Sequence, residues 1–351
     1  MGDYGKVVTG NTPPTKDIEN YENGTYLWAS PADLGTHKLI SETKTKLSSK
    51  GFTKTRPLSK GSVLVTCIGS TIGKTGMATR EMSTNQQINS IVVNENNDNE
   101  FVYYVVQSAF PHYLSSIAVQ AVPIISKSSF ELLPSKRPSL QEQNKIGIFL
   151  SLLDERISTQ HRLIDRLQSL MKGIRHRIIN EAKGKIVCLC EVSDIYQPQT
   201  ISSADLTETG YPVYGANGII GHYTSYNHEA EQVCITCRGN TCGGVNYTKS
   251  KSWITGNAMV VNVDRYQNIV SKRYLYHYLS NCDFNSIISG SGQPQIVRAP
   301  LAKFKIILPT VMQQYKIAHC LDVIQNKINV NSNILNLIIR QKQYLLRKMF
   351  I

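Results

Sequence analysis

Residues 140–182 read LQEQNKIGIFLSLLDERISTQHRLIDRLQSLMKGIRHRIINEA, and their pattern decides the fold. Apolar side chains recur there at alternating spacings of four and three residues, and the same spacing returns in residues 310–351. The two seams are Ile146, Leu150, Leu153, Ile157, Gln160, Ile164, Leu167, Met171, Ile174 and Ile178, and Ile317, Leu321, Ile324, Ile328, Asn331, Leu335, Ile338, Lys342, Leu345 and Met349. A period of 3.5 residues is typical of coiled coils, so we expect two long helices that pair along these seams. The alternative is that each helix packs on its own domain, because Phe149 and Leu170 widen the apolar stripe.

Each long stretch follows a region that has the pattern of short strands, and the two copies repeat at a period near 170 residues. VLVTCIG at 63–69 matches VCITCRG at 233–239, and LQEQNKI at 140–146 matches VMQQYKI at 311–317. Ile91–Asn94 matches Met259–Asn262, two residues out of step. We expect an α+β unit in each copy, with strands at 61–67, 88–94, 231–237 and 258–263 and a helix at 101–109 and 271–280.

Two long helices in one chain would create an internal pseudo-two-fold axis if they pair antiparallel. A helix of about 40 residues is roughly 60 Å long, and duplex DNA has two-fold axes that paired modules use to read two half-sites. Gln160 and Asn331 occupy the same position in the two seams. We expect these amides to meet at the axis and to set the helix register. The alternative is that both lie at the rim of the pair, in contact with water.

The composition is compatible with a protein that contacts a polyanion. The net charge is +13, and residues 1–139, 140–182, 183–309 and 310–351 carry +3, +2, +3 and +5 of it. A merely basic protein is the alternative. No run of 18 apolar residues exists, and the first ten residues do not resemble a signal peptide. The eight cysteines have no framework spacing, which favours a reduced, cytoplasmic protein.

The order of further motifs resembles the specificity subunit of type I restriction-modification systems. In the first copy these motifs are Gly10-Asn-Thr-Pro13, Tyr26-Leu-Trp28, Ile40–Gly51 and Thr84-Asn-Gln86, and in the second they are Tyr211–Gly221, Cys237-Arg-Gly239 and Trp253–Asn257. The resemblance covers essentially the whole chain. It implies two tandem α/β target-recognition domains, residues 1–139 and 183–309, separated by two long antiparallel coiled-coil helices, residues 140–182 and 310–351. There is one departure: the second copy enters its domain through Lys185–Leu189, whereas the first copy begins at the equivalent of Leu189.

The resemblance also implies a function. The chain would be a non-catalytic subunit that selects a bipartite duplex DNA target for adenine methylation or cleavage by its partners. Those partners would be two methyltransferase subunits and restriction subunits, which would use S-adenosylmethionine, Mg²⁺ and ATP, while this chain would hold no cofactor and no metal. Three alternatives stay open: the specificity chain of a fused or smaller, type II-like restriction system, a coiled-coil adaptor that never reads bases, and an ATP-binding enzyme.

Two motifs imitate other chemistry. Gly69–Thr75 resembles a phosphate-binding loop, but it has three residues between its glycines where that loop needs four, and the second copy lacks the lysine and the threonine. We therefore expect a turn between two strands. Cys234, Cys237 and Cys242 suggest zinc, with His222 or His228 as a further ligand. Residues three apart on a strand point to opposite faces, however, so we expect no metal.

Two groups of residues are candidates for contact with DNA. The segment 43–60 is rich in lysine, and no acid occurs between Glu42 and Glu81, which favours phosphate contact over an ordinary solvated loop. The turns near 70–74 and 238–244 contain glycines that permit close approach, and Arg238 could bond a guanine or only a phosphate or carboxylate. The candidates are Lys44, Lys46, Lys50, Lys54, Arg56, Lys60, Ser70, Lys74, Arg238, Asn240, Lys249 and Lys251.

Overall fold

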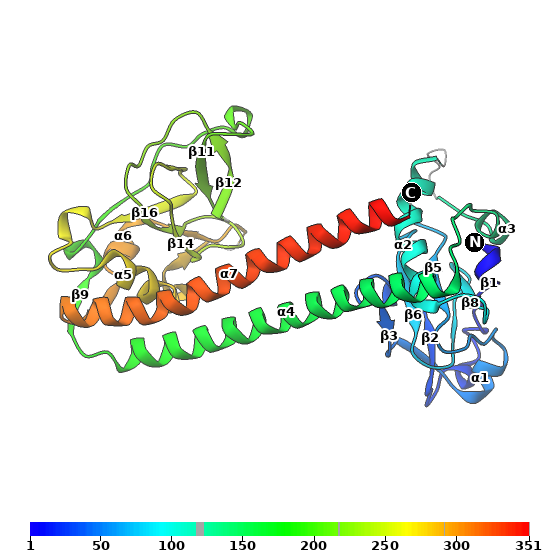
Figure 1. The fold of residues 1–351 in the computed structure, drawn as a ribbon. Coiled ribbons are helices and arrows are strands. Elements are labelled where there is room, and N and C mark those ends of the chain that lie inside the picture. The colour runs from blue at the N-terminus through cyan, green and yellow to red at the C-terminus, as the bar shows by residue number, and fades with distance from the viewer. Residues whose placement is uncertain (117–122, 217, 291, 351) are drawn as a thin grey trace. The chain divides into compact units, whose positions relative to one another are not determined.

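The computed structural model describes residues 1–116, 123–216, 218–290 and 292–350, and the chain divides into two compact units. The first unit comprises Met1–His161 and Ile334–Ile351, and the second comprises Arg162–Asn333. The long helices α4 (Leu140–Glu181) and α7 (Val311–Met349), labelled in Figure 1, each contribute residues to both units. The predicted domain boundaries, by contrast, treat each long helix as a segment separate from the recognition domains. That division differs from the two compact units, and it stays a prediction. Asn217 and Ile351, which belong to predicted segments, lie outside the described residues.

The first unit is built on a sheet in the strand order β1-β8-β5-β6-β3, joined by a smaller sheet in the order β4-β2-β7. Its strands are β1 (Gly5–Thr9), β2 (Tyr26–Ala29), β3 (Leu39–Ile40), β4 (Thr45–Leu47), β5 (Val63–Thr66), β6 (Thr75–Ala78), β7 (Met82–Thr84) and β8 (Ile88–Val93). Its shorter helices are α1 (Ser49–Thr53), α2 (Asn99–Ser116) and α3 (Lys127–Glu131). The predicted helix at 101–109 is confirmed in α2, which contacts β5 and β6. Residues 101–106 are all buried, so packing outweighs their strand-like propensity.

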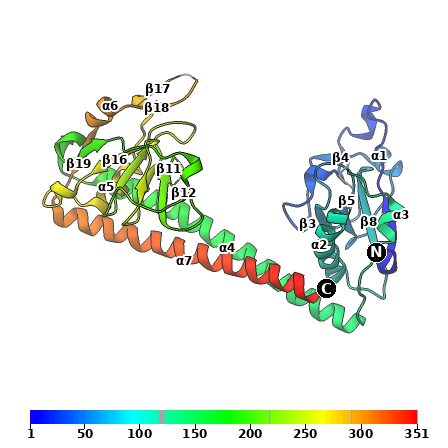
Figure 2. The ribbon, with the colours of Figure 1, turned by 90° about the horizontal axis from the view of Figure 1, so that it is seen from above.

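The second unit repeats this architecture with the sheet β10-β16-β13-β14 and the smaller sheet β12-β11-β15. Its strands are β9 (Lys185–Cys188), β10 (Asp194–Tyr196), β11 (Tyr211–Gly215), β12 (Gly218–Tyr223), β13 (Val233–Thr236), β14 (Val245–Tyr247), β15 (Trp253–Ile254), β16 (Ala258–Asn262), β17 (Ile288–Ser289), β18 (Gln295–Ile296) and β19 (Lys305–Leu308). Its shorter helices are α5 (Lys272–Leu279) and α6 (Arg298–Ala302) (Figure 2). The predicted strands and the helix at 271–280 are confirmed.

Strand pairing corrects one detail of the predicted repeat. Val63 of β5 pairs with Ile91 of β8, and Val233 of β13 pairs with Val261 of β16. Because Val63 and Val233 are equivalent, Ile91 corresponds to Val261 and not to Met259. The two copies are therefore in step through this strand. The sequence match was wrong because a run of similar aliphatic residues can be shifted by two and still look alike, whereas backbone pairing fixes one register.

The two long helices pair antiparallel within each unit. In the first unit, Leu150 and Leu153 near the start of α4 share a core with Ile338 near the end of α7, and in the second unit Ile179 shares a core with Ala318. The predicted seam positions are buried or half-buried, except for Met349, which is exposed. Lys342, a polar interruption of the seam, forms an ion pair with Asp154 of the opposite helix, so the structure explains why a lysine is tolerated there.

A buried glutamine ties each long helix to its domain. Gln314 is completely buried, and its side-chain nitrogen donates to the carbonyl oxygens of Ile269 and Pro309 at 2.9 and 2.8 Å. Its side-chain oxygen accepts a 2.7 Å bond from the amide of Ser271, the N-cap of α5. Gln143, the equivalent residue of the first unit, is also completely buried and bonds Asn97, Asp98 and Pro138. The first turn of each long helix is thus locked to the start of the short helix that packs on the sheet.

We expect Gln314→Ala to destabilise the second unit by about 2–3 kcal/mol, because it leaves a buried amide and buried carbonyls without partners. The measurement is the free energy of unfolding of the full chain from urea titration. Lys316→Ala, at an exposed position of the same helix turn, is the matched control and is expected to cost less than about 0.5 kcal/mol. Equal losses for the two variants would contradict the role given to the buried amide.

Candidate nucleic-acid interface

The same glycine turn closes a hairpin in both units. It connects β5 to β6 through Gly69 and Gly73, and β13 to β14 through Gly239 and Gly243. All four glycines have φ between 87° and 97°, which side chains other than glycine rarely adopt. The amide of Gly73 donates to Thr66, and that of Gly243 donates to Thr236, at 2.9 Å in both units. The predicted turn between two strands is confirmed, and its shape is not that of a phosphate-binding loop.

Two further loops meet this turn at the same end of each sheet. In the first unit, the amide of Cys67 donates to Gln87, and the amide of Asn11, just after β1, donates to Thr84. In the second unit, the amide of Cys237 donates in the same way to Asn257. The glycine turn, the loop after β1 or β10 and the turn before β8 or β16 therefore lie at one end of the sheet, which we call the loop end of each unit.

The two tryptophans of the chain hold the loop after β1 in the first unit and the loop after β10 in the second. The indole nitrogen of Trp28 donates to the carbonyl of Asn11 at 3.1 Å, and that of Trp253 donates to the carbonyl of Gln199 at 3.3 Å. Trp28 lies on β2 and Trp253 on β15, two different strands of the repeat. Different side chains thus hold equivalent loops in place, which indicates that the position of this loop matters in both units.

The predicted turn residues are exposed at the loop ends. Ser70 and Lys74 lie on the first turn, and Arg238 and Asn240 on the second. The backbone of Arg238 pairs with Gln295, while its guanidinium has no ion pair among the described residues. The backbone therefore holds this residue in position and leaves its side chain available for an anion or a base edge.

Lys249 and Lys251 are exposed in the next turn of the second unit. The backbone amide of Lys249 donates to the hydroxyl of Tyr214 at 3.1 Å, and Lys251, with φ of 51°, has its ammonium 3.9 Å from Glu229. A contact at this distance between exposed groups is weak, so Lys251 can exchange it for another anion.

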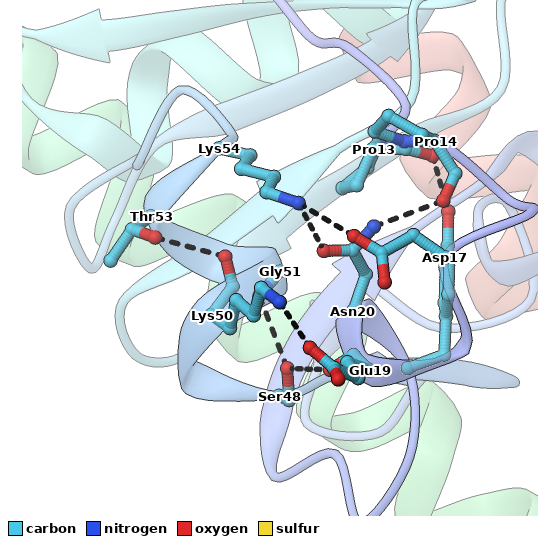
Figure 3. A network of polar contacts seen from close by, with 11 residues as sticks. Pro13, Pro14, Asp17, Glu19, Asn20, Ser48, Lys50, Gly51, Thr53 and Lys54 are labelled. Carbon is cyan, nitrogen blue, oxygen red and sulfur yellow. Dashed lines mark hydrogen bonds and ion pairs between the residues drawn. The ribbon is translucent and has the colours of Figure 1, made fainter.

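The basic segment 43–60 is less free than its sequence suggests, because acids from another part of the chain lie against it. Lys54 is 2.9 Å from Asp17 and also donates to Asn20, while Lys50 pairs with Glu19 (Figure 3). The hydrogen bond from Lys54 is the main cause of the lowered pKa of Asp17. The absence of an acid between Glu42 and Glu81 therefore does not mean that the segment is unpaired.

The other cations of this segment divide into two groups. Lys46 is 2.7 Å from Glu42, and Arg56 donates to the carbonyl of Thr9 at 2.7 Å. Lys44 and Lys60 are exposed and have no ion pair among the residues that the structure describes. The contact of this segment with DNA stays a prediction, and Lys44 and Lys60 are the members best placed to bind phosphate without first breaking an ion pair.

The predicted site contains one uncharged amide, Asn240. Exposed amide side chains at the loop ends also include Gln86 in the first unit and Gln197, Gln199, Asn257 and Gln295 in the second. Gln86 accepts a hydrogen bond from Thr12, and Gln197 donates to the carbonyl of Gly256. The sequence feature that could have identified these amides is their position just after a strand in both copies. Counting charged residues does not detect it.

The proposed helix register stays a prediction. Gln160 is half-buried and belongs to the first unit, whereas Asn331 is half-buried and belongs to the second. The side chain of Asn331 donates to the carbonyl of Lys327, one turn earlier in α7, at 2.7 Å. Between α4 and α7, Asp154 and Lys342 form an ion pair in the first unit.

No group of three or more histidine, cysteine, aspartate or glutamate side chains suited to a metal occurs among the described residues. Cys234 and Cys237 are buried free thiols, and burial raises the pKa of Cys234 to about 12. A thiol of this kind is a poor metal ligand and a poor nucleophile at neutral pH.

In the same described part of the chain, none of the helices is both long and apolar enough to span a membrane.

A duplicated sheet domain with polar loop ends and a paired helix in each unit defines a two-module recognition protein. The sequence model of the family described as "Type I restriction modification DNA specificity domain" matches residues 1–169 and 182–340. These two matches cover most of the chain, and the chain therefore belongs to this family. The function of the chain is to provide DNA sequence specificity.

Individual relatives agree with this assignment. The specificity subunit of the type I restriction enzyme EcoprrI from Escherichia coli is 24% identical over 338 residues, which cover 89% of this chain and 83% of that protein. The S subunit of a type I restriction-modification system from M. genitalium has the same fold, with a TM-score of 0.66 at 16% identity over 99% of this chain and 93% of that one. A structure described for complex assembly of the type I system gives 0.61 at 17% identity, covering 99% and 95%. None of these similarities favours a smaller fused system or an adaptor.

The two kinds of lysine in the basic segment are expected to differ in DNA binding. Replacing Lys44 and Lys60 together by glutamine is expected to flatten the dependence of log affinity on log salt by about 1–2, because each lost phosphate contact removes about 0.9. Replacing Lys50 and Lys54, which are already paired with acids, is expected to change the slope by less than half of that. Titration of labelled duplex with the purified chain or its methyltransferase complex at several salt concentrations measures both slopes. A slope unchanged by the first double replacement would place the segment away from the DNA.

Proposed function

We propose that this chain reads a bipartite duplex DNA target, with one half recognised by the loop end of each unit. The observation that carries this proposal is the repetition of the loop end. Equivalent turns in the two units are fixed by equivalent backbone hydrogen bonds, yet they carry different exposed side chains, with Ser70 and Lys74 where the second unit has Asn240 and Gly244. Two domains with the same backbone fold and different exposed side chains would recognise two different half-sites.

The side chains at the loop ends suit groove recognition. An amide such as that of Gln86 or Asn257 can bond adenine through two atoms in the major groove, and the fork of Arg238 can bond guanine in the same way. Exposed cations such as Lys74, on the first glycine turn, would hold the phosphates and carry no sequence information. The loop ends thus combine both classes of contact that specific binding needs, whereas Lys60 precedes β5, at the end of that strand opposite the turn.

The exposed face of α7 supports docking of partner subunits. Val323, Val330, Leu337 and Tyr344 follow one another at seven-residue intervals and are all more than half exposed. Val323 and Val330 belong to the second unit and Leu337 and Tyr344 to the first, so each unit offers one exposed apolar pair outside the buried seam. We assign each pair to contact with an adenine-methyltransferase subunit, two copies of which would assemble with this chain, and restriction subunits would join that complex.

In this proposal the chemistry belongs to the partners. The methyltransferase and restriction subunits would use S-adenosylmethionine, Mg²⁺ and ATP, and this chain would be catalytically silent and cytoplasmic. Methyl transfer to DNA by the highly purified chain, with no partner present, would refute the silent role.

Selection from a pool of random duplexes by the methyltransferase complex tests the proposal. We expect a motif of two short specified halves and an unspecified gap. Arg238→Ala is expected to relax one position of the half read by the second unit, by roughly 10–100-fold in relative affinity. Lys251→Ala, a matched exposed cation of the same unit, is expected to leave the motif unchanged. A continuous motif, or a uniform loss for Arg238→Ala across all sequences, would contradict base reading by this turn.

A further inference from the structure

The hairpin of β11 and β12 adds a further surface to the loop end of the second unit (Figure 1). β11 runs parallel to β15, and the amide of Thr255, in the turn after β15, donates to the carbonyl of Tyr214 at 2.9 Å. The carbonyl of Ala216, in the turn of the hairpin, accepts hydrogen bonds from the hydroxyls of Thr236 and Thr241 at 2.5 and 3.3 Å. Because Thr241 belongs to the glycine turn, the tip of the hairpin lies directly beside that turn.

Two isoleucines of β12 are exposed next to this tip. Ile219 pairs with Tyr214 and Gly221 pairs with Val213, so Ile220 is the extra residue of a β-bulge. In a regular strand, consecutive side chains point to opposite faces, and one of the two would face the domain. Here Ile219 is 46% exposed and Ile220 is 47% exposed. The hairpin therefore presents two adjacent apolar side chains to solvent.

The composition of the hairpin favours an apolar contact close to a polyanion. A β-carbon at Gly215 would come within 3.0 Å of the side chain of Ile220, so the glycine makes room for this isoleucine. No acidic residue and no lysine or arginine occurs between Glu208 and Glu229. The hairpin thus has no carboxylate of its own to repel phosphate, and no cation of its own to bind it.

The same position of the fold carries a cation in the first unit. Ala29 and Tyr214 are equivalent, because each accepts a backbone hydrogen bond from the turn that follows the neighbouring parallel strand. The residue across from Tyr214 is Ile219, and the residue across from Ala29 is Lys44, which directly precedes the paired Thr45. The two units therefore differ at one exposed position by an isoleucine and a lysine. A lysine suits a phosphate, whereas an isoleucine needs an apolar group.

Duplex DNA offers one such group to a protein that enters its major groove, namely the 5-methyl group of thymine. The other groups that base pairs present there are hydrogen-bond donors and acceptors, and the backbone is charged. The tip of the hairpin adjoins the turn that carries Arg238 and Asn240, two candidates for contact with bases. An apolar pair at this place complements those polar side chains.

We propose that Ile219 and Ile220 contact the methyl group of one thymine in the half-site that the second unit reads. This inference rests on the proposed function, and it names one base of the target and the side chains that select it. The contact with the glycine turn and the shared position with Lys44 select DNA over an apolar protein surface as the occupant. The second half-site therefore contains a thymine whose methyl group contributes to binding.

Replacement of thymine by deoxyuridine, which lacks only the methyl group, tests the proposal. The target selected by the methyltransferase complex is synthesised as a set of duplexes in which each thymine is replaced in turn, and competition measures the relative affinities. We expect uracil at one position to weaken binding roughly three- to fivefold, the effect of one methyl group lost from an apolar contact. In a variant with Ile219→Ala and Ile220→Ala, thymine and uracil at that position are expected to bind equally, because the contact is already absent.

Two references make the outcome decisive. Ile269→Ala changes an isoleucine that is 42% exposed in the same unit but lies just before α5, away from the loop end, and it is expected to keep the methyl effect. Effects of uracil in the other half-site are expected to be the same in all variants, which shows that each variant is folded and bound.

Two results would overturn the proposal and leave the proposed function intact. One is a target of two halves in which no thymine of the second half shows a methyl effect. The other is a methyl effect that persists in the double alanine variant, even if that variant binds every duplex more weakly. Loss of all sequence-selective binding by the unmodified complex would instead contradict the proposed function, and this inference with it.

Discussion

The buried amides of Gln143 and Gln314 are the constraint on which the rest of the structure depends. Each makes its hydrogen bonds at the junction where the first turn of a long helix meets the N-cap of a short one. A buried amide tolerates little displacement, since a lost partner costs about 1–3 kcal/mol. The direction of each long helix is therefore fixed relative to its own sheet, and the loop end of that sheet is fixed with it.

The repeat separates the parts of the domain that hold shape from the parts that differ. Backbone hydrogen bonds at the glycine turns recur in both units, whereas the exposed positions on those turns change, for example from Ser70 to Asn240. Even the anchor of the neighbouring loop changes its strand, from Trp28 to Trp253, while the bonded carbonyl stays equivalent. A frame of this kind can vary its recognition surface without loss of the fold.

The sequence predicted the periodic elements well and the surface less well. Helices α4 and α7 and strands such as β5 and β13 could be predicted from side-chain spacing, because burial imposes a period on the chain. The ion pairs of Lys50 and Lys54 could not be predicted in this way, since their acids, Glu19 and Asp17, lie more than 30 residues away. Pairing across such distances, and the alignment of Ile91 with Val261, depend on tertiary contacts that no local pattern contains.

Exchange of one recognition domain shows whether each unit reads one half of the target by itself. The measurement is sequencing of methylated adenines in cells that carry the methyltransferase partner and a chain whose segment from β10 to α6 comes from a relative with another target. We expect a motif in which one half changes, while the other half and the gap stay the same, because the buried glutamines and the helix seams are untouched. A change in both halves, or in the gap, would contradict independent reading by the two units.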